Sequence, residues 1–203
     1  MRTIFLITLI AAISISCKRS YKTENGIVYY EYWNEGSGQN KVAIEKADAK
    51  TFETTEFDCD CSFAFARDKN HLYIDGKIIK SIDPDSFKFL GNYFFRDKDS
   101  VYFFGFYSDI QDCSIRGINP EKLHLLKYPW AKSENILIHG NATLSLGDIE
   151  RFSIIDENWG KTDKYVIYGN EILKNADPKT FHVINSYSGK DKNHIYEFGK
   201  IKK

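Results

Sequence analysis

The chain has 203 residues, of which 42% are hydrophobic and 15% aromatic, which suffices for one large or two small folded domains and argues against intrinsic disorder. Its 28 basic and 28 acidic residues balance, so no basic excess indicates a nucleic-acid partner. With 13 Tyr and 15 Phe beside four Pro, the composition predicts an all-β fold, because aromatic side chains suit a half-buried pleated surface.

Residues 1–16 have the pattern of a bacterial signal peptide. Arg2 precedes an uncharged run, Ile4–Ile15, which has the length of a signal-peptide core and is too short to span a bilayer comfortably. The run ends at Ser16-Cys17, and a cysteine directly after a small residue at this point resembles the lipobox of bacterial lipoproteins. The resemblance implies that Cys17 carries lipid and becomes the mature N-terminus.

Cleavage without lipid and an uncleaved anchor are the alternatives for this segment. No aspartate follows Cys17, and in the lipoprotein pattern that residue would mean retention at the inner membrane. We therefore expect an outer-membrane lipoprotein that faces the periplasm or the outside of the cell. Residues 17–24 are the predicted lipid-anchored tether, and residues 25–203 are the predicted β-repeat domain.

Aromatic residues are dense near the start of this domain, and two further tryptophans lie in its least regular segments. Aromatic side chains outside a core often contact proteins or sugars, so these residues are the predicted binding surface, with strand packing as the alternative. The residues are Tyr29, Tyr30, Tyr32, Trp33, Trp130 and Trp159.

Three cysteines remain for the domain once Cys17 carries lipid. In an oxidising compartment Cys113 can pair with Cys59 or Cys61, which leaves one thiol over. Cys59 and Cys61 are poorly placed to bridge each other within one extended strand. No second Cys or His pair stands at ligand spacing from them, so we predict no metal site there.

A recurring phrase marks internal repeats. Asp68-Lys69-Asn70-His71-Leu72-Tyr73 returns as Asp191-Lys192-Asn193-His194-Ile195-Tyr196, and degraded copies start at Asp97, near Glu134 and at Asp163. The copies stand about 29 residues apart, except for one longer gap. Asp and Asn side chains hydrogen-bond their own backbone in turns, so each copy is predicted to be a hairpin turn between two strands.

Two other turns recur at fixed offsets from the phrase. Asp75-Gly76 is a strong hairpin signal, and Gly140-Asn141 and Gly169-Asn170 share its offset. Asp83-Pro84, echoed at Asp177-Pro178, places a capping side chain before a residue of preset φ and predicts a single helical turn or type I turn. One unit is then predicted to hold three short strands. The predicted fold is a series of tandem antiparallel β-meanders, solenoid-like or propeller-like.

The three best copies, at residues 68–73, 97–102 and 191–196, resemble the DKNYY family of bacterial repeat proteins, which is named for this phrase. The resemblance covers about two thirds of the chain, from Phe65 onward. It implies a repeat scaffold. Because the family has no assigned activity, the resemblance implies no catalytic residue.

The histidines follow the repeat and no catalytic pattern. His71 and His194 hold one position of it, and His124 and His182 share another position with Lys88. A position that accepts Lys or His between apolar neighbours is the outward face of a strand. We therefore predict no catalytic residue, no bound metal and no cofactor.

These observations predict a lipid-anchored cell-envelope protein whose β-repeat scaffold binds a protein or polymer partner and is not an enzyme. One alternative is a glycan-processing hydrolase that uses a carboxylate pair such as Asp148 and Glu150. Another is an immunity or inhibitor protein that neutralises a toxin.

Overall fold

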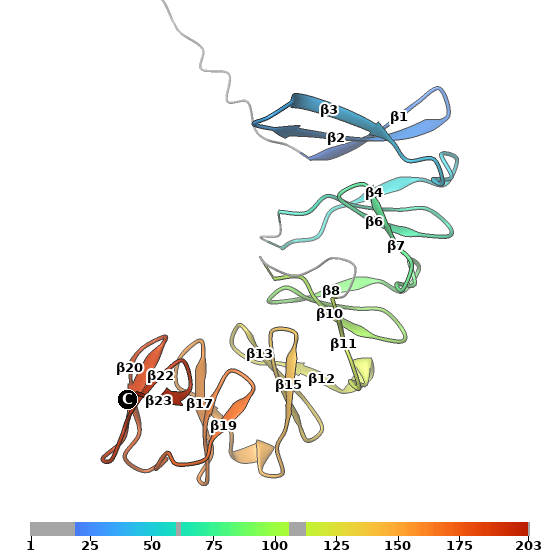
Figure 1. Cartoon of the computed structure of the whole chain (residues 1–203). Helices are drawn as coiled ribbons and strands as arrows, with labels where there is room; N and C mark the ends of the chain where they lie inside the picture. The colour runs from blue at the N-terminus through green and yellow to red at the C-terminus, as the bar shows by residue number, and fades with distance from the viewer. Residues whose placement is uncertain (1–18, 60–61, 106–112, 203) are drawn as a thin grey trace, which may run out of the picture.

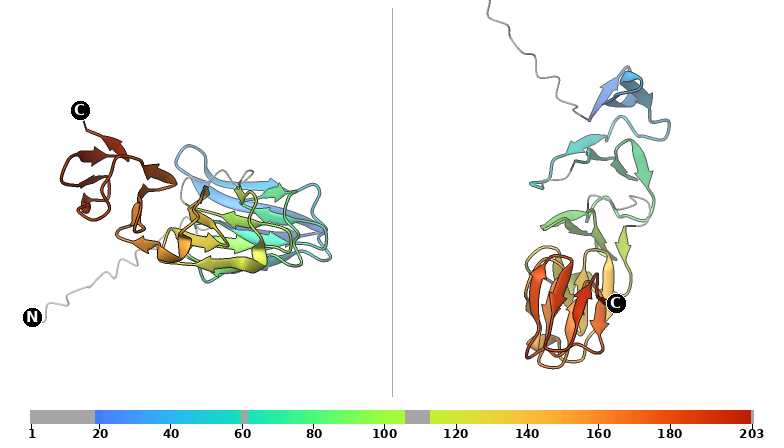
Figure 2. Two further views of the ribbon diagram at one scale, coloured as in Figure 1. Left: turned by 90° about the horizontal axis from the view of Figure 1, so that it is seen from below. Right: turned by 60° about the vertical axis from the view of Figure 1, so that its left-hand side comes forward.

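A computed structural model describes residues 19–59, 62–105 and 113–202. Within them, six antiparallel sheets follow one another along the chain, one of three strands and five of four. Figure 1 and Figure 2 show that the sheets form an open, curved array whose first and last members do not meet. The predicted all-β fold of tandem meanders is confirmed, and the array is open and solenoid-like, not a ring.

We name the sheets A to F in chain order. Sheet A comprises β1 (Ser20–Glu24), β2 (Ile27–Asn34) and β3 (Gly38–Ala43). Sheet B comprises β4 (Glu53–Thr55), β5 (Phe65–Arg67), β6 (Leu72–Ile74) and β7 (Lys77–Ile79). Sheet C comprises β8 (Lys88–Gly91), β9 (Phe94–Arg96), β10 (Val101–Phe103) and β11 (Ser114–Ile115). Sheet D comprises β12 (Leu123–Leu125), β13 (Trp130–Ser133), β14 (Ile136–His139) and β15 (Ala142–Ser145). Sheet E comprises β16 (Ser153–Ile154), β17 (Trp159–Lys161), β18 (Val166–Tyr168) and β19 (Glu171–Leu173). Sheet F comprises β20 (His182–Asn185), β21 (Ser188–Lys190), β22 (Ile195–Glu197) and β23 (Lys200–Ile201). Single 3₁₀ turns, η1 (Pro120–Lys122) and η2 (Ile149–Arg151), precede sheets D and E.

Each of sheets B to F has four strands, so the predicted count of three is wrong. The segment after the Asp-Pro turn is two strands, because the backbone reverses between β8 and β9. There Gly91, Asn92 and Tyr93 have φ values of 117°, 50° and 64°, in the left-handed region where glycine and asparagine are tolerated best. Gly91-Asn92 is the same dipeptide as the predicted turns at Gly140-Asn141 and Gly169-Asn170, but no such pair marks the first turn of the other four-stranded sheets.

The turns lie at two edges of each sheet. In a four-stranded meander, the first and third hairpin turns stand at the same strand ends. The second turn, which contains the repeated phrase, stands at the opposite ends together with the connection to the neighbouring sheet. We call these the inner edge and the outer edge. Figure 1 shows that the inner edge lines the concave side of the array.

The strand pairing fixes the register of every repeat. We number positions from the residue that opens the second turn, position 0, and the residue at position −1 pairs with position +4 in each sheet, as Arg67 does with Leu72 and Lys132 with Leu137. Position 0 is therefore Ser133 in sheet D and Thr162 in sheet E. The predicted starts near Glu134 and at Asp163 are wrong by one residue, because Ser and Thr replace the aspartate there and the next residue is the acidic one. The residues at position 0 are Asp68, Asp97, Ser133, Thr162 and Asp191.

Folded structure begins before the predicted boundary at residue 25. β1 pairs with β2 through a turn at Asn25-Gly26, where φ is 50° and 77°. Tyr21 on β1 packs against Tyr30 and Phe52, with ring centroids 5.4 Å apart in both pairs. Residues 20–24 therefore belong to sheet A and not to a tether.

The core lies between consecutive sheets as a series of hydrophobic clusters. At each junction from sheet B onward, the side chains at positions −3 and +4 of one sheet meet those at positions −2 and +5 of the next. Phe94 and Val101 of sheet C, for example, cluster with Ala131 and Ile138 of sheet D. Each inner sheet is thus stabilised by the sheets on both sides, as in other repeat arrays.

The outward faces of the two end sheets carry ion pairs beside exposed apolar side chains such as Ile27 and Ile195. On sheet A, Lys41 forms ion pairs with Glu24 and Glu31. On sheet F, Glu197 pairs with Lys202 at 2.6 Å. Glu197 stands at position +6, which is aromatic in sheets C and E. Charged pairs thus replace apolar contacts where no further sheet follows in the described chain.

Candidate functional site

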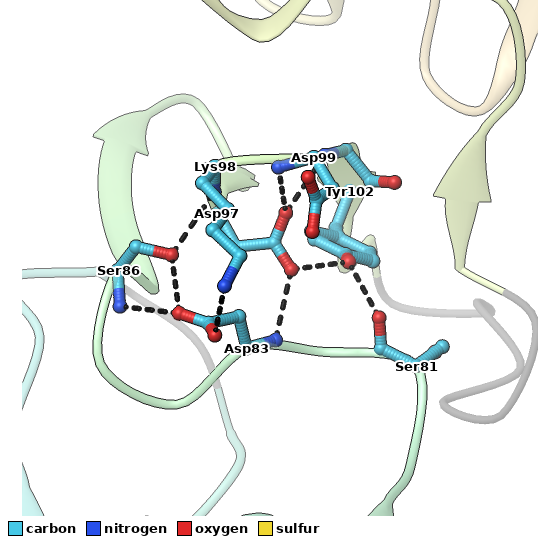
Figure 3. Close-up of polar contacts among 8 residues, drawn as sticks. Ser81, Asp83, Ser86, Asp97, Lys98, Asp99 and Tyr102 are labelled. Carbon is cyan, nitrogen blue, oxygen red and sulfur yellow. Dashed lines mark hydrogen bonds and ion pairs between the residues drawn. The ribbon is translucent and has the colours of Figure 1, made fainter.

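The repeated phrase forms a buried carboxylate centre at the outer edge, shown for Asp97 in Figure 3. Oδ1 of Asp97 accepts hydrogen bonds from the backbone N–H groups of Asp99 at 2.8 Å and Ser100 at 2.7 Å. Oδ2 accepts one from the Tyr102 hydroxyl at 2.8 Å and one from the backbone N–H of Asp83 at 2.9 Å. Because Asp83 opens the Asp-Pro connection, one carboxylate fixes both the turn and the segment that enters the sheet.

The same contacts recur at Asp68 and Asp191. The tyrosine hydroxyl at position +5 donates at 2.6 Å and 3.1 Å, respectively. The backbone N–H groups of Asp48 and Asp177, which open the corresponding connections, each donate at 2.8 Å. Four donors occupy the acceptor sites of such a carboxylate. Across the residues that the structure describes, no cluster of three or more His, Cys, Asp or Glu side chains is placed to hold a metal ion.

The pKa values show how closely the two side chains depend on each other. Burial raises the pKa of Asp191, but donors from Asp177, Asn193, His194 and Tyr196 outweigh it and hold that pKa at about 2. Burial, followed by the hydrogen bond to Asp191, raises the pKa of Tyr196 to about 12. At neutral pH the carboxylate is ionised and the phenol keeps its proton, as the hydrogen bond requires.

Sheets D and E lack the carboxylate and the tyrosine together. Ser133 and Thr162 stand at position 0, and Ile138 and Ile167 stand at position +5. Oγ1 of Thr162 still accepts the backbone N–H groups at positions +2 and +3, at 3.1 Å and 3.2 Å. The Thr162 hydroxyl oxygen thus accepts the same two turn amides that a carboxylate oxygen accepts in the other sheets. Thr162 has no second side-chain oxygen to accept the amide of the connection.

In each of sheets B to F, the residue at position +1 forms an ion pair with a residue of the connection that leads into the sheet. The two charges are exchanged in sheets D and E. In sheet C, Lys98 pairs with Asp83 at 2.7 Å. In sheets D and E the acidic partner stands at position +1 and the basic partner on the connection. These reversed pairs are Glu134 with Lys122 and Asp163 with Arg151. The charged residues of the phrase are therefore engaged within the scaffold.

Trp130 and Trp159 are fully buried, so the prediction that they belong to an exposed binding surface is wrong. Both stand at position −3 and fill a junction between sheets. The Phe152 ring of the connection lies 5.1 Å from Trp130, and a side chain at Gly160 would collide with that ring. The junction has room for a tryptophan because the following sheet has glycine at position −2. The phenylalanine ring of the connection lies over that glycine and packs against the tryptophan. Trp159, Phe181 and Gly189 repeat the arrangement.

The N-terminal aromatic run is only partly exposed. Tyr30 is 7% exposed and stacks on Tyr32 at 5.3 Å in the junction with sheet B, so the surface prediction is wrong for Tyr30. Tyr29 is half-buried under the Lys41 ammonium, 4.3 Å from the ring centroid. Trp33 is 39% exposed and remains available to a partner.

A hollow of about 440 Å³ lies beside Trp33, and Arg19 and Phe63 are among the residues that line it. Arg19 pairs with Asp75 at 2.5 Å and donates to the Ser62 carbonyl at 2.9 Å. These contacts link the first described residue to sheet B and satisfy the guanidinium charge at the mouth of the hollow.

A second group of aromatic side chains, not predicted from the sequence, lies at the inner edge. Tyr128, Tyr187 and Phe198 are 38%, 56% and 61% exposed. The Tyr128 ring lies 5.5 Å from Tyr93 of the preceding sheet, and Tyr187 lies 5.3 Å from Phe198. The Tyr168 ring packs against Gly199, which follows Phe198 in its turn, and this contact places Tyr168 in the same group. Large aromatics are unusual in turns, and this is the signal that sequence reasoning could have used.

The two carboxylates proposed for a hydrolase differ in their surroundings and share no partner among the described residues. Both side-chain oxygens of Asp148 are buried without a hydrogen-bond partner among the described atoms. Glu150 pairs with Lys132 at 3.1 Å, and its side chain is 80% exposed. His124 and His182 are exposed on their strands, as predicted.

The lipid anchor and the disulfide rest on residues that are only partly described. Cys17 and Cys61 lie outside the described residues, while Cys59 packs beside the buried cluster that contains Cys113. Lipidation of Cys17 and pairing of Cys113 with Cys59 or Cys61 stay predictions. In the described part of the chain, no helix has the length and apolar character needed to cross a membrane.

Comparison with known proteins gives one match. No curated protein and no solved structure matches the chain. The profile of the DKNYY family matches residues 65–200, about two thirds of the chain, and this range covers nearly all of the four-stranded repeats. The chain therefore belongs to the DKNYY family.

Proposed function

We propose that this protein is a lipid-anchored protein of the bacterial cell envelope whose β-repeat array binds a protein or polymer partner and catalyses no reaction. The observation that carries the proposal is that the repeated polar residues serve the scaffold. The Asp97 carboxylate has four protein donors, and the ion pairs at position +1 hold the connections. A nucleophile or general base needs a side chain that is open to substrate.

The shape of the array supports a binding role. Tandem repeats commonly bind along an extended concave surface, and the inner edge lines the concave side here (Figure 1). Exposed aromatic side chains gather at this edge, including Trp33, Tyr128 and Tyr187. Aromatic side chains offer a large apolar area at a small entropic cost, which suits them to binding surfaces.

The N-terminal pattern supports the location. An uncharged run ends in Ser16-Cys17, and β1 begins at Ser20. Arg19 is fixed to sheet B through Asp75 and Ser62. A lipid on Cys17 would therefore hold sheet A close to the membrane and leave sheets E and F farther along the array for a partner.

Metabolic labelling with palmitate tests the anchor. The wild-type protein is expected to incorporate the label and to fractionate with the outer membrane, and Cys17→Ala is expected to do neither. Cys59→Ala serves as the control that keeps Cys17 and should be labelled as the wild type is. Equal labelling of the wild type and Cys17→Ala would contradict the anchor.

Capture from envelope fractions tests the binding role. The full-length protein in detergent should retain an envelope component, and Tyr187→Ala should retain less of it than Tyr165→Ala, a control at the outer edge. Release of reducing ends from envelope glycans that disappears in Glu150→Gln would contradict the absence of catalysis and would favour the hydrolase.

A further inference from the structure

Five aromatic side chains follow one another along the inner edge of sheets C to F, and we call them the aromatic track. Four of them lie in inner-edge turns, and Tyr168 ends β18 beside the third turn of sheet E. They belong to four successive sheets of the array (Figure 1). The members are Tyr93, Tyr128, Tyr168, Tyr187 and Phe198.

Contacts across the junctions join the track into two groups. Between sheets C and D, Tyr128 lies 5.5 Å from Tyr93 and stacks on Phe103 at 6.5 Å. Between sheets E and F, the Tyr168 ring covers Gly199, where an added Cβ would stand 3.0 Å from the ring. His139, whose Nε2 lies 3.2 Å from the Glu157 carbonyl, bridges sheets D and E between the two groups.

The most exposed members, Tyr187 and Phe198, bury little of their side chains in the scaffold. Phe198 occupies position +7, which is Asp75 in sheet B, the buried Phe104 in sheet C and glycine in sheets D and E. Phe198 adopts φ of 49° there and is 61% exposed. A bulky side chain in the left-handed region is strained, and the contact of its ring with Tyr187, which is itself 56% exposed, offsets little of that strain. Residues that break a local rule without a structural gain are often functional.

Charged residues near the track form no cationic cluster in the described part of the chain, which disfavours a polyanionic partner. Arg19 is paired with Asp75 at 2.5 Å, and the turns between the aromatic groups bring Lys127 against Asp156 and Glu157. The exposed Lys69, Lys98 and Lys192 lie at the outer edge. Each of these lysines is paired with an aspartate of the connection, so positive charge lies away from the track and does not favour a polyanion there.

We propose that the aromatic track binds a neutral polysaccharide chain. This inference rests on the proposed function and names its polymer partner. Ring faces stack on the apolar C–H faces of pyranose sugars, while tyrosine hydroxyls and turn amides hydrogen-bond the sugar hydroxyls. Stacked sheets stand ~10 Å apart, so an extended chain contacts rings from several sheets in succession.

The narrowness of the track favours a linear polymer over a folded protein. A stable protein interface covers about 800 Å² on each partner with a packed apolar centre. Here the rings are separated by polar groups such as Asn158 and Asn185, which hold the turns through hydrogen bonds. A proline-rich peptide is the other linear ligand that aromatic surfaces accept, and it serves as the competing outcome below.

Titration calorimetry on the full-length protein in detergent tests the inference. The probes are cellohexaose, chitohexaose, maltohexaose and a deca-proline peptide. At least one hexasaccharide should bind the wild type, and the Tyr187→Ala, Phe198→Asn double variant should bind it at least tenfold more weakly. Asparagine is chosen at residue 198 because it tolerates positive φ, and circular dichroism checks that the variant folds.

Tyr165→Ala is the matched control. Tyr165 is 38% exposed, as Tyr128 is, but it belongs to the outer-edge turn of sheet E. Its removal should leave the hexasaccharide affinity unchanged. Binding of deca-proline alone, binding of none of the three hexasaccharides, or an equal loss in Tyr165→Ala would each overturn the inference. If an envelope protein is captured at the inner edge while no hexasaccharide binds, the inference fails and the proposed function stands.

Discussion

Sheet C and sheet E build the same outer-edge turn with different side chains. In sheet C the Asp97 carboxylate accepts the turn amides, the Tyr102 hydroxyl and the amide of the connection. In sheet E the hydroxyl of Thr162 accepts the turn amides, and Ile167 replaces the tyrosine. The fold therefore requires the turn but not the carboxylate. A buried carboxylate is kept where a phenol is present to satisfy it, since an unsatisfied buried charge is costly.

The replacements in sheets D and E extend to the neighbouring positions. The ion pair at position +1 is reversed, as in Glu134 with Lys122. Position −3 changes from phenylalanine to tryptophan, and position −2 of the following sheet becomes glycine, as in Trp130 and Gly160. These positions change together because they meet within one junction, so the repeat has two self-consistent versions.

Removal of a junction tryptophan should cause the largest loss of stability. Trp159→Ala is expected to lower the free energy of unfolding by about 3–5 kcal/mol, because it leaves a large cavity between sheets E and F. Trp33→Ala is the control, since Trp33 is 39% exposed, and should change stability by less than about 0.5 kcal/mol. Urea denaturation measures both. Similar losses would mean that Trp159 does not fill the junction.

Truncation at position 0 should separate the two versions of the turn. Asp97→Ala is expected to cost about 2–4 kcal/mol, because it leaves the amide of Asp83 and the turn amides without their acceptor. The Tyr102 hydroxyl keeps only the Ser81 carbonyl, at 3.1 Å. Thr162→Ala should cost about 1–2 kcal/mol, since only turn amides lose a partner. Denaturation of the two variants in parallel checks the order, and an equal or larger loss at Thr162 would contradict it.

Low pH should destabilise the turns that have aspartate at position 0 and not those that have serine or threonine there. The folded-state pKa of Asp191 is about 2, below the ordinary 3.8, so its contribution to stability is present above about pH 4 and is lost as pH falls toward 2. The Tm of the wild type should therefore fall more steeply between pH 5 and pH 2 than that of Asp191→Asn. Parallel slopes in thermal scans would show that Asp191 is not held in this way.

The reversed ion pair should have the smallest effect. Lys122 and Glu134 are both 55% exposed, so Lys122→Ala is expected to cost at most about 1 kcal/mol, and less at high salt. The exchange Lys122→Glu with Glu134→Lys should restore most of that loss. A salt-independent loss above 2 kcal/mol would assign the pair a role in packing.

Much of the fold follows from residues with strong local preferences. Asp75-Gly76 and Asp83-Pro84 occur at turns, where their backbone preferences place them. The exposed positions of His124 and His182 follow from alternation along a strand. The register of sheets D and E did not follow, because Ser133 and Thr162 form the turn with hydroxyls while the acidic residue beside each suggested a shifted phrase.

The errors in the candidate site have the same origin. With position 0 at Ser133, Trp130 falls at position −3 beside Phe65 and Phe94 of the other repeats and is expected in the core. The exposure of Tyr128 and Tyr187 depends on the reversal between the first two strands of a sheet. The turns that contain Tyr128 and Tyr187 have no glycine to mark that reversal, so sequence reasoning missed it.

A double-mutant cycle on Asp97 and Tyr102 tests the central claim most directly, since it converts sheet C toward the version of sheets D and E. Asp97→Ser and Tyr102→Ile should each destabilise the protein, and the double variant should be more stable than the sum of the two losses by about 1–2 kcal/mol. That coupling is expected because the carboxylate and the phenol satisfy each other in the buried junction. Additive losses, within about 0.3 kcal/mol, would contradict the account of the repeated phrase as a mutually dependent structural pair.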